Sequence, residues 1–531
     1  MAASRQHSAR AASENDAETS AVMRSLMLAF VSGFALVVAT LNLIVVSWRR
    51  AGHFGDIPMR VLDKVVPLAV YGLIRFLLGG YFRRIEVFHA ERVPKGPVIF
   101  AVNHPGSVTD GFVVGTCVPR RAHFLATAQL FRLPPLAWLL RTCGIIPLNR
   151  KQDDPTAMRS VADSFASAFR VLERGEAVVI FPEGITYDDA QLKSLKSGAA
   201  RLALELEHRH GGNLGLQIIP IGLTYSAKDR YRSEVLVYFG QPINVAGFLP
   251  QYTERRKECI SGLTAKIERR LQSLLVHLPQ MERAHTVEIV KRLYLQRLRL
   301  GNSVIVEPVS ALAEEVILTQ AISDAADFAH QEMPERMAAF LAQHQRYERL
   351  LKQLRLSDGA VEELADNRHI GVARTFGLGS MAIVLFPVAL IGWLHWRPPT
   401  RLIESLTRRF MDPKKRKAQT AHSSMLAGIF IYGVSFAFYG MLAFLWLGLP
   451  VAGWYALGLP VTGLIGHFYF GEIRRLAAAL RTSAILLRAP VAKRRVLRIR
   501  SALVREIESM RKVYRQSRPA DRILIRGNAA D

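Results

Sequence analysis

The chain has 531 residues, which is enough for two or three domains. Half of its residues are hydrophobic, yet its formal net charge is +26 at pH 7. Apolar stretches combined with a large cationic excess are typical of a protein that is embedded in, or lies on, an anionic membrane. A basic chain can also bind nucleic acid, but no nucleic-acid motif is present and the basic residues flank apolar runs. Composition therefore argues against a nucleic-acid partner and predicts contact with anionic membrane lipids.

The chain has three cysteines, Cys117, Cys143 and Cys259. Three cysteines cannot form a disulfide framework, and no CxxC pair suggests a zinc site. We therefore expect reduced thiols and no metal ion, which suits a domain that faces the cytosol.

The N-terminal part predicts a membrane anchor. Residues 1–25 form a polar segment of mixed charge, and no small-residue cleavage site follows the first apolar run, so no signal peptide is expected. Residues 26–47 are uncharged over a length that spans a bilayer as a helix, and a Trp-Arg-Arg sequence follows them. We expect a transmembrane helix there, with a buried helix of a soluble domain as the alternative. Residues 48–84 predict an amphipathic interfacial segment.

Short apolar runs alternate with helical periodicity between residues 85 and 247. The runs include PVIFAVN at 97–103, EAVVIFP at 176–182 and LQIIPIGLTY at 216–225, and each ends in polar residues, glycine or proline. This alternation predicts an α/β domain, with a mixed sheet and flanking helices.

The remainder of the chain predicts helices. Residues 248–370 are charge-mixed and predict a helical extension in which we find no chemistry. Residues 371–470 predict a membrane region, with apolar runs at 376–396, 425–448 and 449–470. Residues 471–531 form a basic tail, which we expect either to contact anionic headgroups or to be a solvated helix.

The run NHPGSVTD at 103–110 follows an apolar strand and so lies at a strand-to-helix turn. An alcohol is a poor nucleophile until a base takes its proton, and His is the usual base because its unperturbed pKa is about 6.5. A carboxylate on the other ring nitrogen fixes the tautomer and stabilises the imidazolium. His104 and Asp110 would diverge by about 240° on a continuous helix. They can meet only if Pro105-Gly106 makes a turn and the helix begins after it.

Three further runs follow predicted strands. In FPEGIT at 181–186, Glu183 and Gly184 would place a carboxylate and backbone N–H groups beside a substrate. GIIPLNR at 144–150 ends in Arg150, whose guanidinium fork suits a phosphate. IPIG at 219–222 closes another strand. Taken singly, each also fits a plain tight turn or a surface arginine.

In this order and at these separations, the four runs resemble the four sequence blocks of the glycerolipid acyltransferases, which include glycerol-3-phosphate and lysophosphatidate acyltransferases. The resemblance covers about residues 85–245. It implies that His104 is the general base and that Asp110 orients it. It also implies a set of residues that serve the acceptor substrate: Arg150, Glu183, Gly184 and Pro220.

Two departures suggest a subgroup. Five residues rather than the commonest four separate His104 from Asp110, and Thr186 stands where the third block often has arginine. With LKSG at 195–198, the pattern looks more like the long, fungal-type glycerol-3-phosphate/dihydroxyacetone-phosphate acyltransferases and their bacterial relatives, which also have a helical, membrane-spanning C-terminal extension. Lys196 matches that subgroup's lysine, which implies that it supplies positive charge to the acceptor phosphate.

The resemblance implies a membrane enzyme of phospholipid biosynthesis, in the cell inner membrane or endoplasmic reticulum, with its catalytic domain in the cytosol. It would transfer a fatty acyl group from acyl-CoA or acyl carrier protein to the sn-1 hydroxyl of glycerol 3-phosphate or dihydroxyacetone phosphate. Lysophosphatidate or another lysophospholipid is the alternative acceptor. A membrane scaffold or lipid-binding protein with an inactive domain is the alternative from another class, and the intact His104/Asp110/FPEG set argues against it. No cofactor is expected. No covalent acyl-enzyme is expected either, because neither Ser107 nor a cysteine lies in a nucleophile elbow.

The membrane topology can be tested. If the catalytic domain is cytosolic and 376–396 spans the bilayer, the basic loop after it lies outside, although short basic loops prefer the cytosol. Pro387 and nearby glycines make a bent or re-entrant segment feasible. We therefore predict that 376–396 returns to the same face and that the tail after 470 is cytosolic.

Single cysteines, Lys415→Cys and Arg498→Cys, in a background without the native three, would test this topology. We expect an impermeant thiol reagent applied to intact cells to label neither. Labelling of both from outside would contradict the re-entrant arrangement and leave three ordinary spans.

Overall fold

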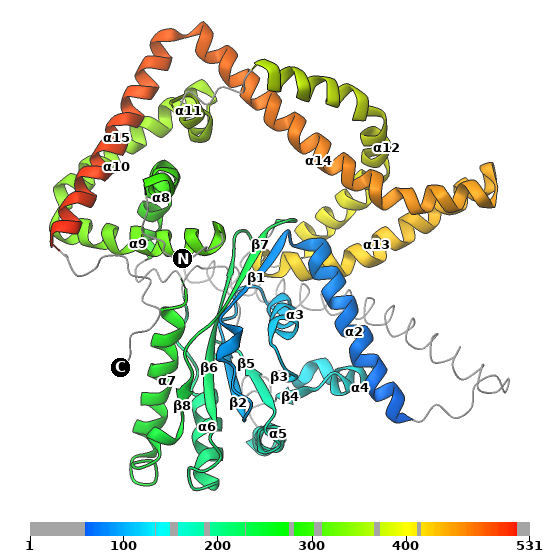
Figure 1. Ribbon diagram of the computed structural model, residues 1–531, viewed down its shortest axis with the longest axis vertical. Helices are drawn as coiled ribbons and strands as arrows, with labels where there is room; N and C mark the ends of the chain where they lie inside the picture. Colours follow the sequence, from blue (N-terminus) through cyan, green and yellow to red (C-terminus); the bar gives the residue numbers. More distant parts are fainter. Residues whose placement is uncertain are drawn as a thin grey trace, which may run out of the picture. The chain divides into compact units, whose positions relative to one another are not determined.

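The computed structural model describes residues 59–132, 134–148, 158–184, 192–228, 230–275, 281–301, 311–365, 372–410 and 416–517 (Figure 1). The chain divides into two compact units, one of Met1–His277 with Glu404–Phe430 and one of Leu278–Ile403 with Ile431–Asp531. The transmembrane helix predicted at 26–47 lies outside the described residues.

A mixed sheet of eight strands forms the centre of the first unit. In spatial order its strands are β1 (Arg84–Phe88), β7 (Glu234–Phe239), β6 (Gln217–Tyr225), β2 (Val98–Val102), β5 (Ala177–Ile180), β3 (Ala122–Thr127) and β4 (Ile145–Leu148), and β8 (Ile243–Asn244) pairs with β6. The five strands from β6 to β4 are parallel to one another, whereas β7 runs antiparallel to β6. The predicted mixed sheet with flanking helices is confirmed.

β2 occupies the middle of this sheet because it is apolar on both faces. All five of its residues are buried. Phe100 and its neighbours on one face pack towards α2 (Met59–Tyr81) and α3 (Val108–Cys117). Ile99 and Ala101 on the other face pack towards α5 (Met158–Glu173), α6 (Gly198–Arg209) and α7 (Arg256–Gln272). A continuously apolar strand is typical of a parallel sheet that is covered by helices on both sides.

The first unit extends beyond the boundary predicted at residue 247, because α7 belongs to it. The buried side chains of α7 are Cys259, Leu263, Ile267 and Leu271, and all four lie in the core with α5 and α6. A spacing of four residues puts them in one stripe of the helix. Charged residues fill most other positions of α7, so its average composition resembles that of a solvated helix.

Two apolar faces distinguish α2. Leu78 and Tyr81 are buried in the core beside α3, whereas Leu68 and Phe76 are 70% and 77% exposed. α2 is thus apolar on its solvent side as well as on its core side, and the interfacial role expected for 48–84 stays a prediction.

The second unit is helical throughout its described part. Its helices α8 (Met281–Gly301), α9 (Ala311–Glu332), α10 (Pro334–Leu354) and α11 (Asp358–Ala365) pack with α15 (Pro490–Ser517). Residues 490–517, expected as part of a basic tail, thus form a helix with a buried face. Arg500 within that face is 5% exposed and pairs with Asp358 and Glu362, each at 3.2 Å.

Long apolar helices occupy the predicted membrane region: α12 (Val372–Phe410), α13 (Arg416–Leu447) and α14 (Leu449–Arg488). Two stretches, Ser423–Leu447 and Leu449–Arg474, are long and apolar enough to cross a membrane, judged by length and composition. They coincide with the predicted runs at 425–448 and 449–470. The re-entry of 376–396 stays a prediction and falls within α12, which contains Pro387, Pro398 and Pro399.

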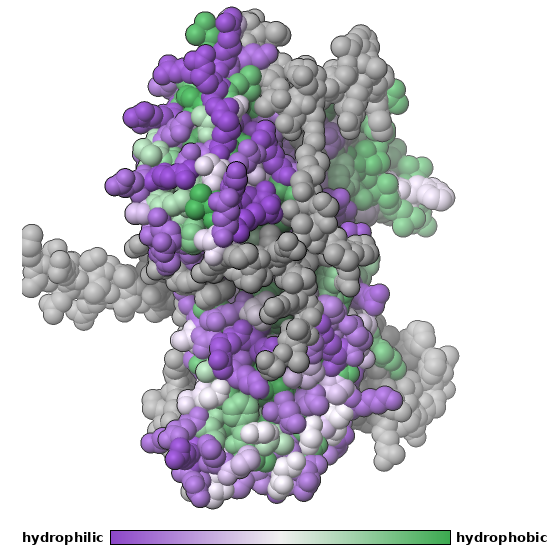
Figure 2. Space-filling view, turned by 60° about the vertical axis from the view of Figure 1, so that its left-hand side comes forward, coloured by the Kyte–Doolittle hydropathy of each residue, from purple (hydrophilic) through white to green (hydrophobic). Residues whose placement is uncertain are grey.

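Large apolar side chains are exposed along α13 and α14, among them Phe438, Trp446 and Trp454. Figure 2 shows one largely hydrophobic area (green) at the upper right, whereas green and purple residues are mixed over the rest of the visible surface. Apolar patches of this kind mark contact with a membrane or a partner.

Candidate active site

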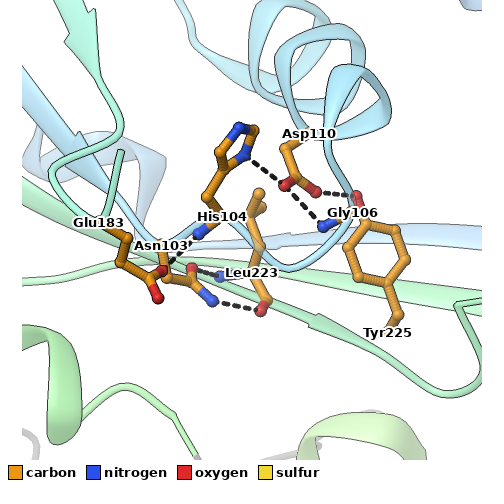
Figure 3. Close-up of polar contacts among 7 residues, drawn as sticks. All are labelled: Asn103, His104, Gly106, Asp110, Glu183, Leu223 and Tyr225. Carbon is orange, nitrogen blue, oxygen red and sulfur yellow. Dashed lines mark hydrogen bonds and ion pairs between the residues drawn. The ribbon is translucent and has the colours of Figure 1, made fainter. Parts of the chain in front are cut away.

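His104 and Asp110 meet in the turn between β2 and α3 (Figure 3). The His104 Nδ1 atom lies 2.9 Å from the Asp110 Oδ2 atom. α3 begins at Val108, after the Pro105-Gly106 turn, so that Asp110 lies in the first turn of the helix. The structure thus brings the two side chains together by the turn that their spacing required. The Asp110 carboxylate is fully buried, whereas the His104 ring keeps 20% of its surface exposed.

The turn has a tight backbone. Ser107, the residue before α3, has φ 58° and ψ −132°, a conformation that L-residues rarely adopt and that costs on the order of 1–3 kcal/mol. Gly106 donates its N–H to the Asp110 Oδ2 atom at 2.7 Å. A Cβ atom at position 106 would lie 2.6 Å from the Asp110 Oδ1 atom and 3.2 Å from the Tyr225 hydroxyl. Glycine is therefore required at this position by close approach.

Three donors surround the buried Asp110 carboxylate. They are the His104 ring and the Gly106 N–H, both on Oδ2, and the Tyr225 hydroxyl, which donates to Oδ1 at 2.7 Å. Burial, together with the neighbouring Asp110 carboxylate, raises the pKa of Tyr225 well above its usual range, so the hydroxyl keeps the proton that it donates. A buried carboxylate is tolerated when its oxygens are hydrogen-bonded in this way.

The free nitrogen of His104 is Nε2. With Asp110 beside Nδ1, the neutral tautomer that satisfies this hydrogen bond has its proton on Nδ1 and its lone pair on Nε2. The described residues provide no hydrogen-bond partner for Nε2. Phe181, the residue after β5, stacks on the imidazole with ring centroids 4.2 Å apart. The ring is thus fixed on one face and along one edge, and its basic nitrogen remains available.

Glu183 holds the backbone of the same turn. Its Oε1 atom accepts the His104 N–H at 2.7 Å, and its Oε2 atom accepts the Lys193 N–H at 3.2 Å. Burial raises the pKa of Glu183, and the two backbone donors oppose that rise. Through its two oxygens, the Glu183 carboxylate therefore joins the loop after β5 to the His104 turn.

Gly184 and Lys196 lie against each other in the loop after β5. Gly184 has φ +72°, and the Lys196 Nζ atom lies 2.8 Å from the position that a Cβ of residue 184 would take. The Lys196 N–H donates to the Pro182 carbonyl at 2.8 Å. The lysine side chain thus crosses the glycine beside Glu183, and it is exposed.

The two remaining predicted site residues are placed differently. Pro220 is buried within β6, in register with Ala101 of β2, and does not reach the exposed edge of the turn. Arg150 lies outside the described residues; β4, which precedes it, ends at Leu148. β4 is the third strand from β2, roughly 14 Å away at about 4.8 Å per strand, and the two strands end at the same edge of the sheet.

The sequence did not predict the roles of three residues of the site: Asn103, which links two strands, Phe181, which stacks on His104, and Tyr225, which donates to Asp110. The Asn103 amide donates to the Leu223 carbonyl at 3.0 Å and accepts the Leu223 N–H at 2.7 Å. This pair extends the contact between β2 and β6 past the last ladder pair, Val102 with Ile221. Residues two apart on a strand share a face, so fixing Leu223 also fixes Tyr225.

The region that contains this site is similar in sequence to known proteins. Residues 84–224 match the family model described as Acyltransferase. This region is an acyltransferase domain. The chain is 33% identical over 309 residues to an uncharacterized acyltransferase of Schizosaccharomyces pombe, which covers 42% of this chain and 46% of that protein. It is 27% identical over 259 residues to glycerol-3-phosphate O-acyltransferase 1 of Saccharomyces cerevisiae, which covers 47% of this chain and 31% of that protein.

These relatives place the acyltransferase domain in the glycerolipid acyltransferase family. The matches span less than half the length of the two yeast proteins. A solved structure, the 1-acyl-sn-glycerophosphate acyltransferase from Thermotoga maritima, is 18% identical with a TM-score of 0.31, and the match covers 44% of this chain and 92% of that one.

Gly106→Ala tests the close approach in the acyltransferase domain. The new methyl group would displace the pinned Asp110 carboxylate, so we expect acyl transfer to fall by about tenfold or more, in line with the effect of misplacing a catalytic group by about 1 Å. The matched control is Gly111→Ala in α3, where nothing lies within 4 Å of the added atom. The control should keep wild-type turnover and gain roughly 0.5–1 kcal/mol of stability. Equal turnover of both variants would show that the turn has room to adjust.

Proposed function

We propose that this chain is a membrane-bound O-acyltransferase that transfers a fatty acyl group from acyl-CoA or acyl carrier protein to the sn-1 hydroxyl of glycerol 3-phosphate or dihydroxyacetone phosphate. The observation that carries the proposal is the state of His104. Its Nδ1 atom is held by the buried Asp110, and its Nε2 atom has no hydrogen-bond partner in the described part of the chain, within a domain of the acyltransferase family.

In the proposed reaction, His104 Nε2 removes the proton of the acceptor hydroxyl, and the hydroxyl oxygen attacks the carbonyl carbon of the thioester. The tetrahedral intermediate collapses with loss of the thiolate, which takes the proton from the imidazolium. Asp110 stabilises the transient positive charge on His104, because its carboxylate is buried and aligned with Nδ1. The acyl group moves directly from sulfur to oxygen, so no acyl-enzyme forms.

We assign the acceptor phosphate to Lys196 and Arg150. Lys196 is exposed next to Glu183 and has no ion pair among the described residues. Arg150 follows β4, which ends at the same edge of the sheet as β2. Glu183 and Gly184 serve the acceptor through the shape of their loop, since both Glu183 oxygens already accept backbone N–H groups. A contact from Pro220 to the substrate also stays a prediction.

Glycerol 3-phosphate is favoured as acceptor by two Saccharomyces cerevisiae relatives named glycerol-3-phosphate O-acyltransferase, at 27% and 31% identity. A lysophospholipid is the second candidate, favoured by the relative from Borreliella burgdorferi named 1-acyl-sn-glycerol-3-phosphate acyltransferase, at 25% identity. The apolar stretches of α13 and α14 and the exposed apolar side of α2 support attachment to the inner membrane or endoplasmic reticulum, with the domain in the cytosol and basic residues against anionic lipids.

Product analysis tests the proposed reaction. Purified membranes with the protein are incubated with acyl-CoA or acyl carrier protein thioester and with glycerol 3-phosphate, dihydroxyacetone phosphate or lysophosphatidate. Mass spectrometry should detect a monoacyl product acylated at sn-1. A diacyl product from lysophosphatidate alone would favour the second candidate, and no product from any acceptor would contradict both.

His104→Ala should lower the rate by about 10²–10⁴-fold, because the acceptor hydroxyl loses its base. Asp110→Asn should also lower it, by setting the wrong imidazole tautomer. Both variants should remain folded and membrane-bound. The control is His208→Ala, at an exposed histidine of α6 away from the site, which should keep wild-type activity. A rate for His104→Ala above about a tenth of wild type would rule out the base role, since that loss is far below the usual range.

Arg150→Ala and Lys196→Ala should raise the KM for a phosphorylated acceptor more than the KM for the acyl donor, because each removes a cation that binds phosphate. Arg150→Lys should not restore full function, since the guanidinium fork is lost. Lys95→Ala, at an exposed lysine of the same unit, is the control. Equal effects on both KM values would mean that these residues only support the fold.

A further inference from the structure

We propose that Tyr225 is a positioning residue that tunes the basicity of His104 through Asp110. The proposal rests on the proposed acyltransferase function for its kinetic consequences. Tyr225 is the last residue of β6, in a segment more than a hundred positions from the His104 turn, and its hydroxyl is the donor on the outer oxygen of the Asp110 carboxylate (Figure 3).

Tyr225 is held in place independently of Asp110. Its backbone pairs with Val235 of β7, and two residues earlier Leu223 is fixed to the Asn103 side chain by two hydrogen bonds. Its ring lies 5.8 Å from that of Phe82 in the core beside α2. The sheet therefore fixes the position of the Tyr225 hydroxyl. The Asp110 carboxylate has to lie where it can accept a hydrogen bond from this donor.

The two oxygens of Asp110 have different partners. Oδ2 accepts from His104 and from the Gly106 N–H, whereas Oδ1 accepts from Tyr225. Among the described residues, Tyr225 is the one donor to Oδ1. Without the hydroxyl, Oδ1 would be buried with no hydrogen bond, and the negative charge would be less dispersed. A more concentrated charge beside Nδ1 binds the imidazolium more tightly.

In the described part of the chain, the titratable groups that contact the His104 turn or Asp110 lie on three elements, and the exposed Lys196 lies beside Glu183. Asp110 lies on α3, Glu183 follows β5, and Tyr225 lies on β6. Glu183 and Asp110 are carboxylates that favour the protonated imidazole, and Tyr225 acts on His104 only by moderating Asp110. Cys117 lies near Tyr225, and burial raises the pKa of its thiol to about 11, so it adds no charge near neutral pH.

The direction of the effect follows from this arrangement. Loss of the Tyr225 hydroxyl should raise the pKa of the His104 imidazole, and the enzyme then needs a higher pH to free its base. The acid limb of the plot of kcat/KM against pH should therefore move to higher pH. We expect a displacement of about 0.5–1 pH unit, because the free energy that corresponds to it is a fraction of that of a hydrogen bond to a charged group.

The test compares Tyr225→Phe with Tyr347→Phe in the full-length protein. Tyr347 of α10 donates to the buried Asp358 at 2.6 Å, so its replacement removes a similarly buried Tyr–Asp bond in the second unit, outside the acyltransferase domain. We expect Tyr225→Phe to lower kcat by about 3- to 30-fold with little change in the KM values and to shift the acid limb up. The two variants should lower the melting temperature by similar amounts. Tyr347→Phe should leave the pH profile unchanged.

A second measurement does not depend on turnover. Diethyl pyrocarbonate modifies the unprotonated imidazole, so the pH dependence of His104 labelling, followed by peptide mass spectrometry, reports the pKa of that ring directly. It should rise in Tyr225→Phe and stay constant in Tyr347→Phe. If the wild-type protein acylates no acceptor but this shift is seen, the proposed function fails while the coupling between Tyr225 and His104 stands.

Fluorinated tyrosine covers the case in which Tyr225→Phe does not fold. 3,5-Difluorotyrosine at position 225 keeps the ring and strengthens the donor, so the acid limb and the labelling pKa should move down. Opposite shifts for the two replacements would support the proposal. Unchanged pH dependence in a folded Tyr225 variant, by kinetics and by labelling, would overturn it.

Discussion

The fully buried carboxylate of Asp110 constrains the part of the acyltransferase domain that surrounds the His104 turn. Burying an ionised group is costly unless its oxygens are hydrogen-bonded, so donors must converge on it. The donors come from the His104 ring, from the Gly106 backbone and from the Tyr225 hydroxyl. Each donor accounts for a local feature: the late start of α3, the need for glycine at 106 and the alignment of β6 with β2. The carboxylate that requires these donors is also the group that contacts the His104 ring.

The parallel strands explain how residues distant in sequence reach this carboxylate. β2, β5 and β6 are neighbours that end at the same edge, so the segments that follow or finish them are adjacent. His104 thereby contacts Glu183 over 79 positions, and Asp110 contacts Tyr225 over 115. The Glu183 carboxylate connects the His104 turn to the loop that carries Lys196.

The arginines of α15 lie in two different environments. Arg500 is buried in the second unit, where Asp358 and Glu362 compensate its charge. Arg498 and Arg505 of the same helix are exposed and available to an anionic surface. α13 and α14 contain apolar stretches that are long enough to cross a membrane. Basic composition alone could not separate the arginines that stabilise α15 from those that remain in solvent, because burial depends on the helices packed against it.

Local patterns in the sequence were enough to determine the α/β class, the turn that brings His104 to Asp110, and the two apolar helices near 425–470. Each depends on periodicity or on residues a few positions apart, and such features are decided by short-range geometry. The tertiary structure decided which strands are neighbours, and therefore that Tyr225 donates to Asp110, that Asn103 binds Leu223, and that Phe181 covers His104. It also assigned α7 to the first unit, through a stripe of four apolar residues within a highly charged helix. These contacts join segments that no local pattern relates, because strand order is chosen by the packing of the whole core.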